Sequence, residues 1–249
     1  MNVLLNVRGL TKRFGGVRAV DGLSLDLAAG EVVALIGPNG AGKSTAFDLI
    51  CGQRRRDAGT VTLDGRPLSG RSPREAWAAG IARSFQVAGL FASMTAAENV
   101  QMALIAANRG CFRLLPRARH QHRAEAEALL DAAGLAGVGD RPAAVLAHGD
   151  AKRLELAMAL AGSPRLLMMD EPTAGMAPDA RAGLMRTVRE RVQATKLSVL
   201  FTEHDMDIVF ATADRVLVLD RGRLIAEGAP GAVRADPRVR AVYLGEEVG

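Results

Sequence analysis

Eight residues, Gly37–Ser44, constrain this chain more than any other part of its sequence. They read Gly-Pro-Asn-Gly-Ala-Gly-Lys-Ser and follow the unbroken apolar run Val32–Ile36. That run predicts a central strand covered on both faces. Glycines let the next loop wrap with its N–H groups inward, and a helix starting near Gly42 would aim its positive end at the same place. The pattern predicts a strand, a phosphate-binding loop and a helix.

The residues of this loop suit the parts of a magnesium-bound triphosphate. Lys43 would neutralise the β- and γ-phosphates, Ser44 would be a ligand of Mg²⁺, and Thr45 is a further phosphate donor. The candidate nucleotide-binding residues of the segment are Gly37, Asn39, Gly40, Ala41, Gly42, Lys43, Ser44 and Thr45.

A second apolar run, Leu166–Met169, ends in the acidic pair Asp170 and Glu171. Asp170 would hold Mg²⁺ through its water shell, and Glu171 would face the water that attacks the γ-phosphate. Acidic pairs at strand ends are common for structural reasons alone. The phosphate-binding loop in the same chain favours the functional interpretation.

The remaining pattern alternates strands with helices, which predicts an α/β fold with a mostly parallel sheet. Leu23–Leu27 alternates apolar and polar residues, as expected for a half-buried strand. Further strands are predicted at Val3–Val7, Thr60–Leu63, Ser198–Thr202 and Val216–Leu219, and a helix at Ala180–Ala194.

The chain of 249 residues is predicted to be a single domain in three parts. Residues 1–86 and 163–235 would form a nucleotide-binding core, 87–162 a helical insert rich in Ala, Leu and Arg, and 236–249 a tail. No apolar run approaches the roughly 18 residues of a membrane span, and the N-terminus lacks an apolar signal region. We therefore expect the chain not to form a pore by itself.

Charge and cysteine content point to a reducing compartment and to no nucleic-acid partner. The formal net charge of +5 is modest for a nucleic-acid-binding protein. Cys51 and Cys111 lack metal-ligand spacing and are interpreted as small apolar residues. Trp77 is assigned to the core.

The ordered set of motifs resembles the ATP-binding cassette (ABC) family over nearly the whole chain. The set comprises the phosphate-binding loop, Gln86 in Arg-Ser-Phe-Gln, a signature at Leu146–Asp150, the Asp-Glu pair, and His204 in Thr-Glu-His-Asp. The resemblance implies a P-loop NTPase (RecA-like) core, an N-terminal antiparallel β subdomain and a helical subdomain particular to the family, with ATP and Mg²⁺ as cofactors.

The resemblance also implies roles for three further residues. Gln86 would sense Mg²⁺ and the attacking water at the junction of the two lobes, and His204 would hydrogen-bond the γ-phosphate. Phe14 matches the aromatic residue that stacks on adenine, although a core role for it stays open.

Two segments depart from the family pattern. The usual signature is Leu-Ser-Gly-Gly-Gln, whose residues reach the nucleotide of a partner ATPase; here the segment reads Leu-Ala-His-Gly-Asp. Ala147, His148 and Gly149 stay candidate contacts through helix N-terminal amides, without the serine hydroxyl. Ala177 stands where the family usually has Asp. These losses lead to the hypothesis that the chain works beside a different ATPase subunit.

Details of the motifs and the C-terminal segment resemble the ATPase subunits of bacterial branched-chain or hydrophobic amino-acid importers. The resemblance implies a second ABC ATPase subunit, two transmembrane permeases and a periplasmic solute-binding protein as partners. It places the chain peripherally on the cytoplasmic face of the inner membrane. The apolar loop residues of 87–94 would grip a permease helix, although a subdomain-core role for them stays open.

Two other classes stay open at this point. One is the ATPase of an ABC exporter, such as a lipopolysaccharide-extraction subunit, which has a similar length. The other is a soluble ABC ATPase acting on ribosomes or DNA. Such proteins usually carry two cassettes, coiled coils or zinc sites, for which 249 residues leave no room.

Overall fold

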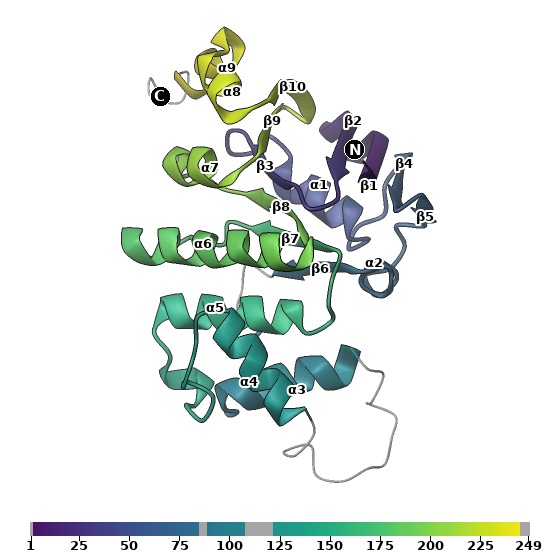
Figure 1. The fold of residues 1–249 in the computed structure, drawn as a ribbon. Helices are drawn as coiled ribbons and strands as arrows, with labels where there is room; N and C mark the ends of the chain where they lie inside the picture. The colour runs from purple at the N-terminus through teal and green to yellow at the C-terminus, as the bar shows by residue number, and fades with distance from the viewer. Residues whose placement is uncertain (1, 85–88, 108–121, 245–249) are drawn as a thin grey trace.

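The computed structural model describes residues 2–84, 89–107 and 122–244. A six-stranded sheet lies at its centre, with a smaller antiparallel sheet on one side and a group of three helices at one end (Figure 1). The predicted α/β class, with a mostly parallel sheet, an N-terminal antiparallel sheet and a helical subdomain, is confirmed.

The central sheet has the strand order β10-β9-β3-β8-β7-β6. Strand β10 pairs with β9 antiparallel, and the other strands pair parallel. The strands are β3 (Val32–Ile36), β6 (Ile81–Ser84), β7 (Leu166–Asp170), β8 (Ser198–Thr202), β9 (Arg215–Asp220) and β10 (Arg223–Gly228). Every residue of β3, β7 and β8 is buried, as expected for strands covered on both faces.

The smaller sheet has the order β2-β1-β4-β5 and is antiparallel throughout. Its strands are β1 (Val3–Phe14), β2 (Val17–Ala28), β4 (Ala58–Leu63) and β5 (Arg66–Leu68). The predicted alternation holds in β2, where Leu23, Leu25 and Leu27 point into the core. Strands β1 and β2 extend well beyond the predicted segments.

Helix α1 (Lys43–Ile50) packs in the core between the two sheets, where Phe47 and Leu49 are fully buried. The opposite face of the central sheet is covered by α6 (Pro178–Thr195), α7 (Met206–Thr212) and α8 (Pro230–Ala235). Alternate residues of each central strand serve the two cores. In β3, for example, Val33 and Leu35 face α1, whereas the other three residues face the second core.

The helical group consists of α3 (Ala96–Ala107), α4 (Arg123–Ala132) and α5 (His148–Leu160), with a 3₁₀ turn at Ala143–Val145 before α5. It has its own apolar cluster, in which Val100, Leu104 and Leu130 are buried. Helix α5 also contributes Leu156 and Leu160 to the core under the sheet, so it joins the two parts.

Two short helices complete the fold: α2 (Pro73–Ala79) precedes β6, and α9 (Pro237–Leu244) follows α8. The Ser72 hydroxyl caps α2, and Gly80 ends it with a left-handed φ of 102°. Among the described residues, none of the helices combines the length and apolar composition that a membrane crossing requires.

The assignments of single residues to the core had mixed outcomes. Cys51 is buried, as predicted, and Cys111 lies outside the described residues. The assignment of Trp77 to the core is wrong: 41% of this residue is exposed. Helix α2 is only two turns long, and its indole lies at the rim of a cavity between the sheet and the helical group.

Candidate functional site

The site lies at the edge of the central sheet where β3, β8 and β7 end. Because the three strands are parallel, their carboxyl ends meet at that edge. Lys43 begins α1 directly after the loop that follows β3, β7 ends at Asp170, and His204 follows β8. In open α/β sheets this edge is where ligands bind.

Two glycines allow the loop after β3 to lie against backbone on its outer side. A Cβ at Gly37 would be 2.0 Å from the carbonyl oxygen of Leu219, and one at Gly42 would be 2.2 Å from that of Ala19. Their φ angles of 150° and 103° also disfavour L side chains. Only glycine fits at these positions. The loop therefore has the tightly wrapped form of a phosphate cradle, and α1 begins directly after it.

The side chains of the loop suit an anionic ligand. Lys43 is 6% exposed, and its ammonium donates to the carbonyl oxygens of Gly37 (2.6 Å) and Pro38 (3.0 Å). It is thereby held against the loop itself. Ser44 is exposed and Thr45 half-buried in the first turn of α1, so both hydroxyls lie beside the helix N-terminus.

Asp170 is 3% exposed and is held at both carboxylate oxygens. Thr202 Oγ1 donates to Oδ1 at 2.7 Å, and an Arg83 Nη2 donates to Oδ2 at 3.0 Å. A carboxylate has about four lone-pair sites, so about two stay available to accept bonds from the waters of a metal ion. Carboxylate oxygens are ligands that Mg²⁺ prefers, and Asp170 ends its strand at the same edge of the sheet as the loop after β3.

Glu171 has an unusual backbone. Its φ is 49°, in the left-handed region that a non-glycine residue rarely adopts. Its N–H donates to the carbonyl oxygen (3.2 Å) and to the hydroxyl (3.1 Å) of Thr202. Its carboxylate Oε1 accepts from His204 Nε2 at 2.8 Å. Both side chains are partly exposed, so the pair faces solvent at the edge of the sheet.

The loop after Glu171 is braced by groups that sequence reasoning missed. Glu203 is 4% exposed and accepts from the N–H (2.9 Å) and hydroxyl (2.6 Å) of Thr173. Arg181 donates to the carbonyl oxygen of Met176 (2.7 Å) and pairs with Asp205 (3.0 Å). Glu203 and Asp205 flank His204 in the sequence, and their position next to a motif residue could have indicated them. Their partners lie 30 and 24 residues away, which no local pattern reveals.

The signature segment lies at the start of α5. Ala147 is the N-cap residue and makes no side-chain capping bond, and His148 is the first helical residue. The His148 ring donates from Nε2 to the carbonyl oxygen of Ala174 at 3.0 Å. A Cβ on Gly149 would be 3.5 Å from the Met176 side chain. The signature thus touches the 171–177 loop of its own chain.

Phe14 lies at the end of β1 and is 42% exposed, so the core alternative is wrong. Two cations approach its ring: Lys12 Nζ at 5.6 Å and Arg54 Cζ at 5.4 Å from the centroid. An exposed aromatic face near the first strands can stack on a base. Gln86, by contrast, lies outside the described residues.

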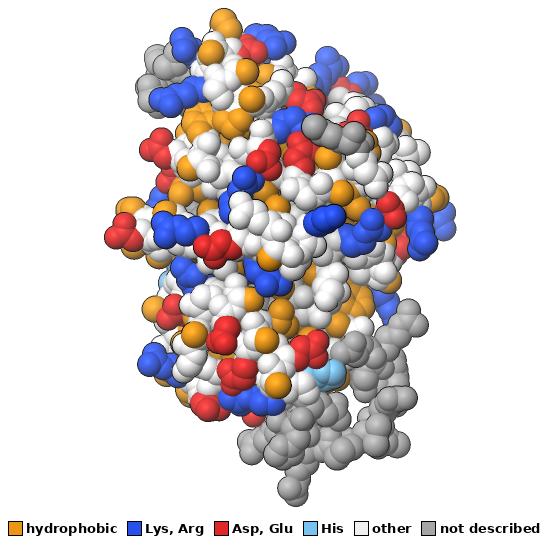
Figure 2. Space-filling model, in the orientation of Figure 1, with side chains coloured by type: hydrophobic (Ala, Val, Ile, Leu, Met, Phe, Trp, Pro, Cys, Tyr) orange, Lys and Arg blue, Asp and Glu red, His pale blue; other side chains and the backbone are white. Residues whose placement is uncertain are grey.

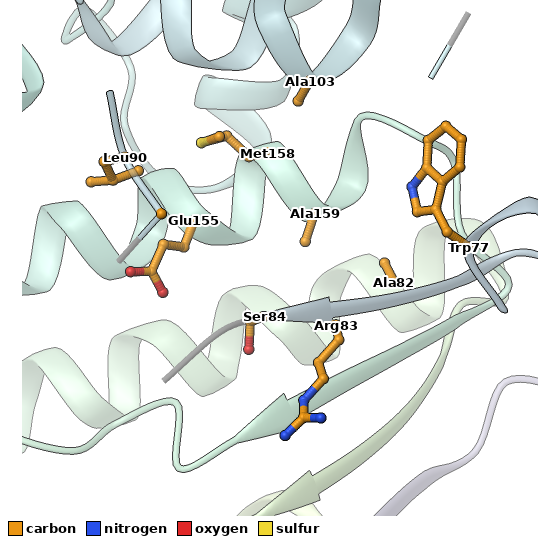
Figure 3. A pocket seen from close by; sticks show the side chains of 10 residues that line it. Trp77, Ala82, Arg83, Ser84, Leu90, Ala103, Glu155, Met158 and Ala159 are labelled. Carbon is orange, nitrogen blue, oxygen red and sulfur yellow. The ribbon is translucent and has the colours of Figure 1, made fainter. Parts of the chain in front are cut away.

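A cavity of about 260 Å³ separates β6 and α2 from the helical group. Figure 3 shows Ala159 of α5 facing the strand across it, with Trp77 at one end and Leu90 at the other. Glu155 also lines the cavity. Burial raises the pKa of its carboxyl group, and the nearby Lys152 ammonium partly offsets this rise.

These features define a class of protein: a P-loop ATPase with a helical subdomain beside its nucleotide site. Comparisons with known proteins agree. The family described as "ABC transporter" matches residues 20–174, and the family described as "Branched-chain amino acid ATP-binding cassette transporter" matches residues 223–249. The chain belongs to the ABC transporter family and is one of its ATP-hydrolysing cassettes.

Individual relatives cover nearly the whole chain. The high-affinity branched-chain amino acid transport ATP-binding protein LivG of Salmonella typhimurium is 39% identical over 250 residues, with 98% of each chain covered. BraF of Pseudomonas aeruginosa, which carries the same description, is 36% identical over 253 residues, again with 98% of each covered. The crystal structure of the ADP conformation of MJ1267, an ATP-binding cassette of an ABC transporter, superposes with a TM-score of 0.89 at 31% identity, covering 98% of this chain and 100% of that chain.

Proposed function

We propose that this chain is the ATP-hydrolysing subunit of a bacterial importer for branched-chain amino acids or related small solutes. The observation that carries the proposal is the similarity to LivG and BraF over 98% of both chains, which extends into the C-terminal segment 223–249. The exporter and soluble alternatives receive no comparable support.

The chain would bind ATP at two places, the phosphates and the adenine base. The glycine cradle, the buried Lys43 ammonium and the first turn of α1 would take the phosphates, because N–H groups and a cation converge there. Phe14 would stack on the adenine at the other end. Mg²⁺ would be held by Ser44 and, through water, by Asp170; when bound it offsets charge on the phosphates. Gln86 remains a further proposed ligand.

Glu171 would act as the general base. Its carboxylate lies at the solvent-facing end of β7, next to the proposed metal carboxylate, and is oriented by the bond from His204. A water near Glu171 would lose its proton to this carboxylate as it attacks the γ-phosphate. When nucleotide binds, the His204 ring would release Glu171 and donate to a γ-phosphate oxygen.

The signature residues would serve a second nucleotide site. In a dimer of cassettes, the N-terminus of α5, with Ala147, His148 and Gly149, would face the partner's γ-phosphate. Because this chain lacks the usual serine hydroxyl and an Asp at Ala177, we propose that its partner is a different ATPase subunit. Mixing the two subunits should raise ATP hydrolysis well above the sum of the separate rates. A fully active, cooperative homodimer of this chain alone would contradict the proposal.

The cavity beside β6 is the proposed docking place of a permease segment. It lies between the two lobes, and Leu90, Phe91 and Met94 on the adjoining loop are at least partly exposed. Val87 and Ala88 of the same proposed grip lie outside the described residues. Two permeases docked here, with a periplasmic solute-binding protein beyond them, would hold the chain at the cytoplasmic face of the inner membrane. No nucleic-acid partner is proposed.

Uptake of labelled solutes tests the proposed function. Cells lacking this chain are complemented with the wild type or with Glu171→Gln, and entry of leucine, isoleucine, valine, urea and benzoate is compared. Restoration of leucine-type uptake by the wild type alone supports the proposal. Equal uptake of every solute in all three strains, or copurification of the chain with ribosomal RNA in place of permeases, would refute it.

A further inference from the structure

Arg83 is a half-buried cation that the sequence motifs leave without a role. It lies in β6, one residue before the end of the described segment, and 12% of its side chain is exposed. Figure 3 shows its side chain extending from the strand away from α5, toward the neighbouring strands of the sheet. A guanidinium in such a place needs partners for its several donors.

The partners of Arg83 connect the metal carboxylate to the phosphate-loop helix. Nη2 donates to Asp170 Oδ2 at 3.0 Å. Nη1 donates to Asp48 Oδ1 at 2.7 Å and to Gln53 Oε1 at 2.9 Å. The guanidinium carbon is also 5.8 Å from the centroid of the Phe47 ring. The planar, rigid donor fork is therefore fixed from several directions, and its free motion is small.

Asp48, which accepts from the other side of the Arg83 guanidinium, is itself held by a second arginine. Asp48 Oδ2 accepts from Arg54 Nε at 2.8 Å, and Asp48 belongs to α1, the helix that begins at Lys43. A continuous path of ion pairs therefore runs from Arg54 through Asp48 and Arg83 to Asp170. The orientation of the carboxylate is tied to the position of the helix that carries Ser44.

The bond from Arg83 removes the rotational freedom of the Asp170 carboxylate. Thr202 holds Oδ1 and Arg83 holds Oδ2, so the orientation of the carboxylate is set by one donor at each oxygen. The lone pairs that stay available then point in fixed directions. Without the guanidinium, the buried Oδ2 would lose the cation that donates to it, and the carboxylate could turn about its bond from Thr202.

We propose that Arg83 is a positioning residue that orients the Asp170 carboxylate toward the magnesium ion of the bound nucleotide. The inference rests on the proposed metal role of Asp170. Residues that hold a metal-binding group in place typically affect metal affinity by 10- to 100-fold when they are removed. Arg83 acts through Asp170, so we expect an effect at the lower end of that range.

The test is a titration of Mn²⁺, as a probe for the Mg²⁺ site, into protein mixed with one equivalent of ADP. Free Mn²⁺ is measured by electron paramagnetic resonance, with ADP alone as the blank. Arg83→Met should weaken Mn²⁺ binding about tenfold, while ADP affinity in EDTA stays unchanged. Arg83→Lys keeps the charge but loses the planar donor fork, so its Mn²⁺ affinity should lie between those of the wild type and Arg83→Met. Arg165→Met is the matched control, because it removes an exposed arginine that pairs with Asp64.

A double-mutant cycle separates this role from general damage to the fold. If Arg83 acts through Asp170, adding Arg83→Met to Asp170→Asn should weaken Mn²⁺ binding no further. A further tenfold loss in the double variant would overturn the inference. So would tighter Mn²⁺ binding by Arg83→Met, or a parallel loss of ADP affinity in EDTA. Unchanged Mn²⁺ binding by Asp170→Asn alone would overturn the proposed metal role, and this inference with it.

Discussion

Replacing Thr202 by Val should destabilise the protein markedly although the two side chains have nearly the same shape. Thr202 is fully buried, and its hydroxyl donates to Asp170 Oδ1 at 2.7 Å. Valine keeps the packing and the strand propensity but leaves the carboxylate oxygen without that donor. A lost hydrogen bond to a charged group costs about 1.5–3 kcal/mol.

The other contact of this hydroxyl adds little to the cost. It accepts from the Glu171 N–H at 3.1 Å, but that N–H also donates to the Thr202 carbonyl oxygen at 3.2 Å, which the substitution preserves. The total is therefore about 2–3 kcal/mol. In a chain of this length, each kcal/mol shifts the unfolding midpoint by about 2–4 °C, so the variant should unfold roughly 4–12 °C lower.

The assay is thermal unfolding followed by circular dichroism in nucleotide-free buffer. Thr195→Val is the matched control: its hydroxyl donates to the Arg191 carbonyl oxygen at 2.8 Å on an exposed turn of α6, so its loss should cost no more than about 0.5 kcal/mol. Thr202→Ser, which restores the hydroxyl, should recover much of the difference. Equal midpoints for the two valine variants would refute the reasoning.

Three further predictions concern the cradle, the base and the buried thiol. Glu171→Gln should bind ATP normally but lower turnover on the order of 10²-fold or more, measured by phosphate release; unchanged hydrolysis would remove Glu171 from its role. Gly42→Ala should abolish nucleotide binding in equilibrium dialysis, because its Cβ would be 2.2 Å from the Ala19 carbonyl oxygen; normal affinity would contradict the cradle. Burial raises the pKa of the Cys51 thiol to about 12, so in a Cys111→Ser background a disulfide reagent at pH 8 should label the unfolded protein only. Because the unfolded thiol ionises at lower pH than the buried one, stability should also fall as pH rises above about 9, and rapid native labelling would refute the assigned burial.

Sequence patterns predicted the central sheet well because the physical cause is local. An unbroken apolar run such as Val32–Ile36 has no solvated face to offer, so it must lie inside a covered sheet. The glycines of the loop were equally informative, since only their backbone freedom permits the observed wrapping. Fold class and the nucleotide loop therefore followed from the chain itself.

The contacts that orient the site could not be predicted in the same way. Arg83 and Asp170 are 87 residues apart, and Glu203 and Thr173 are 30 apart; each pair meets only once the strands are side by side. Trp77 shows the opposite error: it was assigned to the core, but the short helix α2 leaves the indole at a rim. Hydrophobicity alone does not reveal which apolar residues face a cavity.

The bond between His148 and the Ala174 carbonyl has a practical consequence for anyone redesigning the signature. Replacing His148 by the glycine that is common in the family would remove the imidazole that bonds the Ala174 carbonyl, and with it a contact between α5 and the loop that begins at Glu171. If the signature faces a second cassette as proposed, this one side chain would serve both subunit recognition and the stiffness of the chain's own loop, so that a substitution at 148 would alter both.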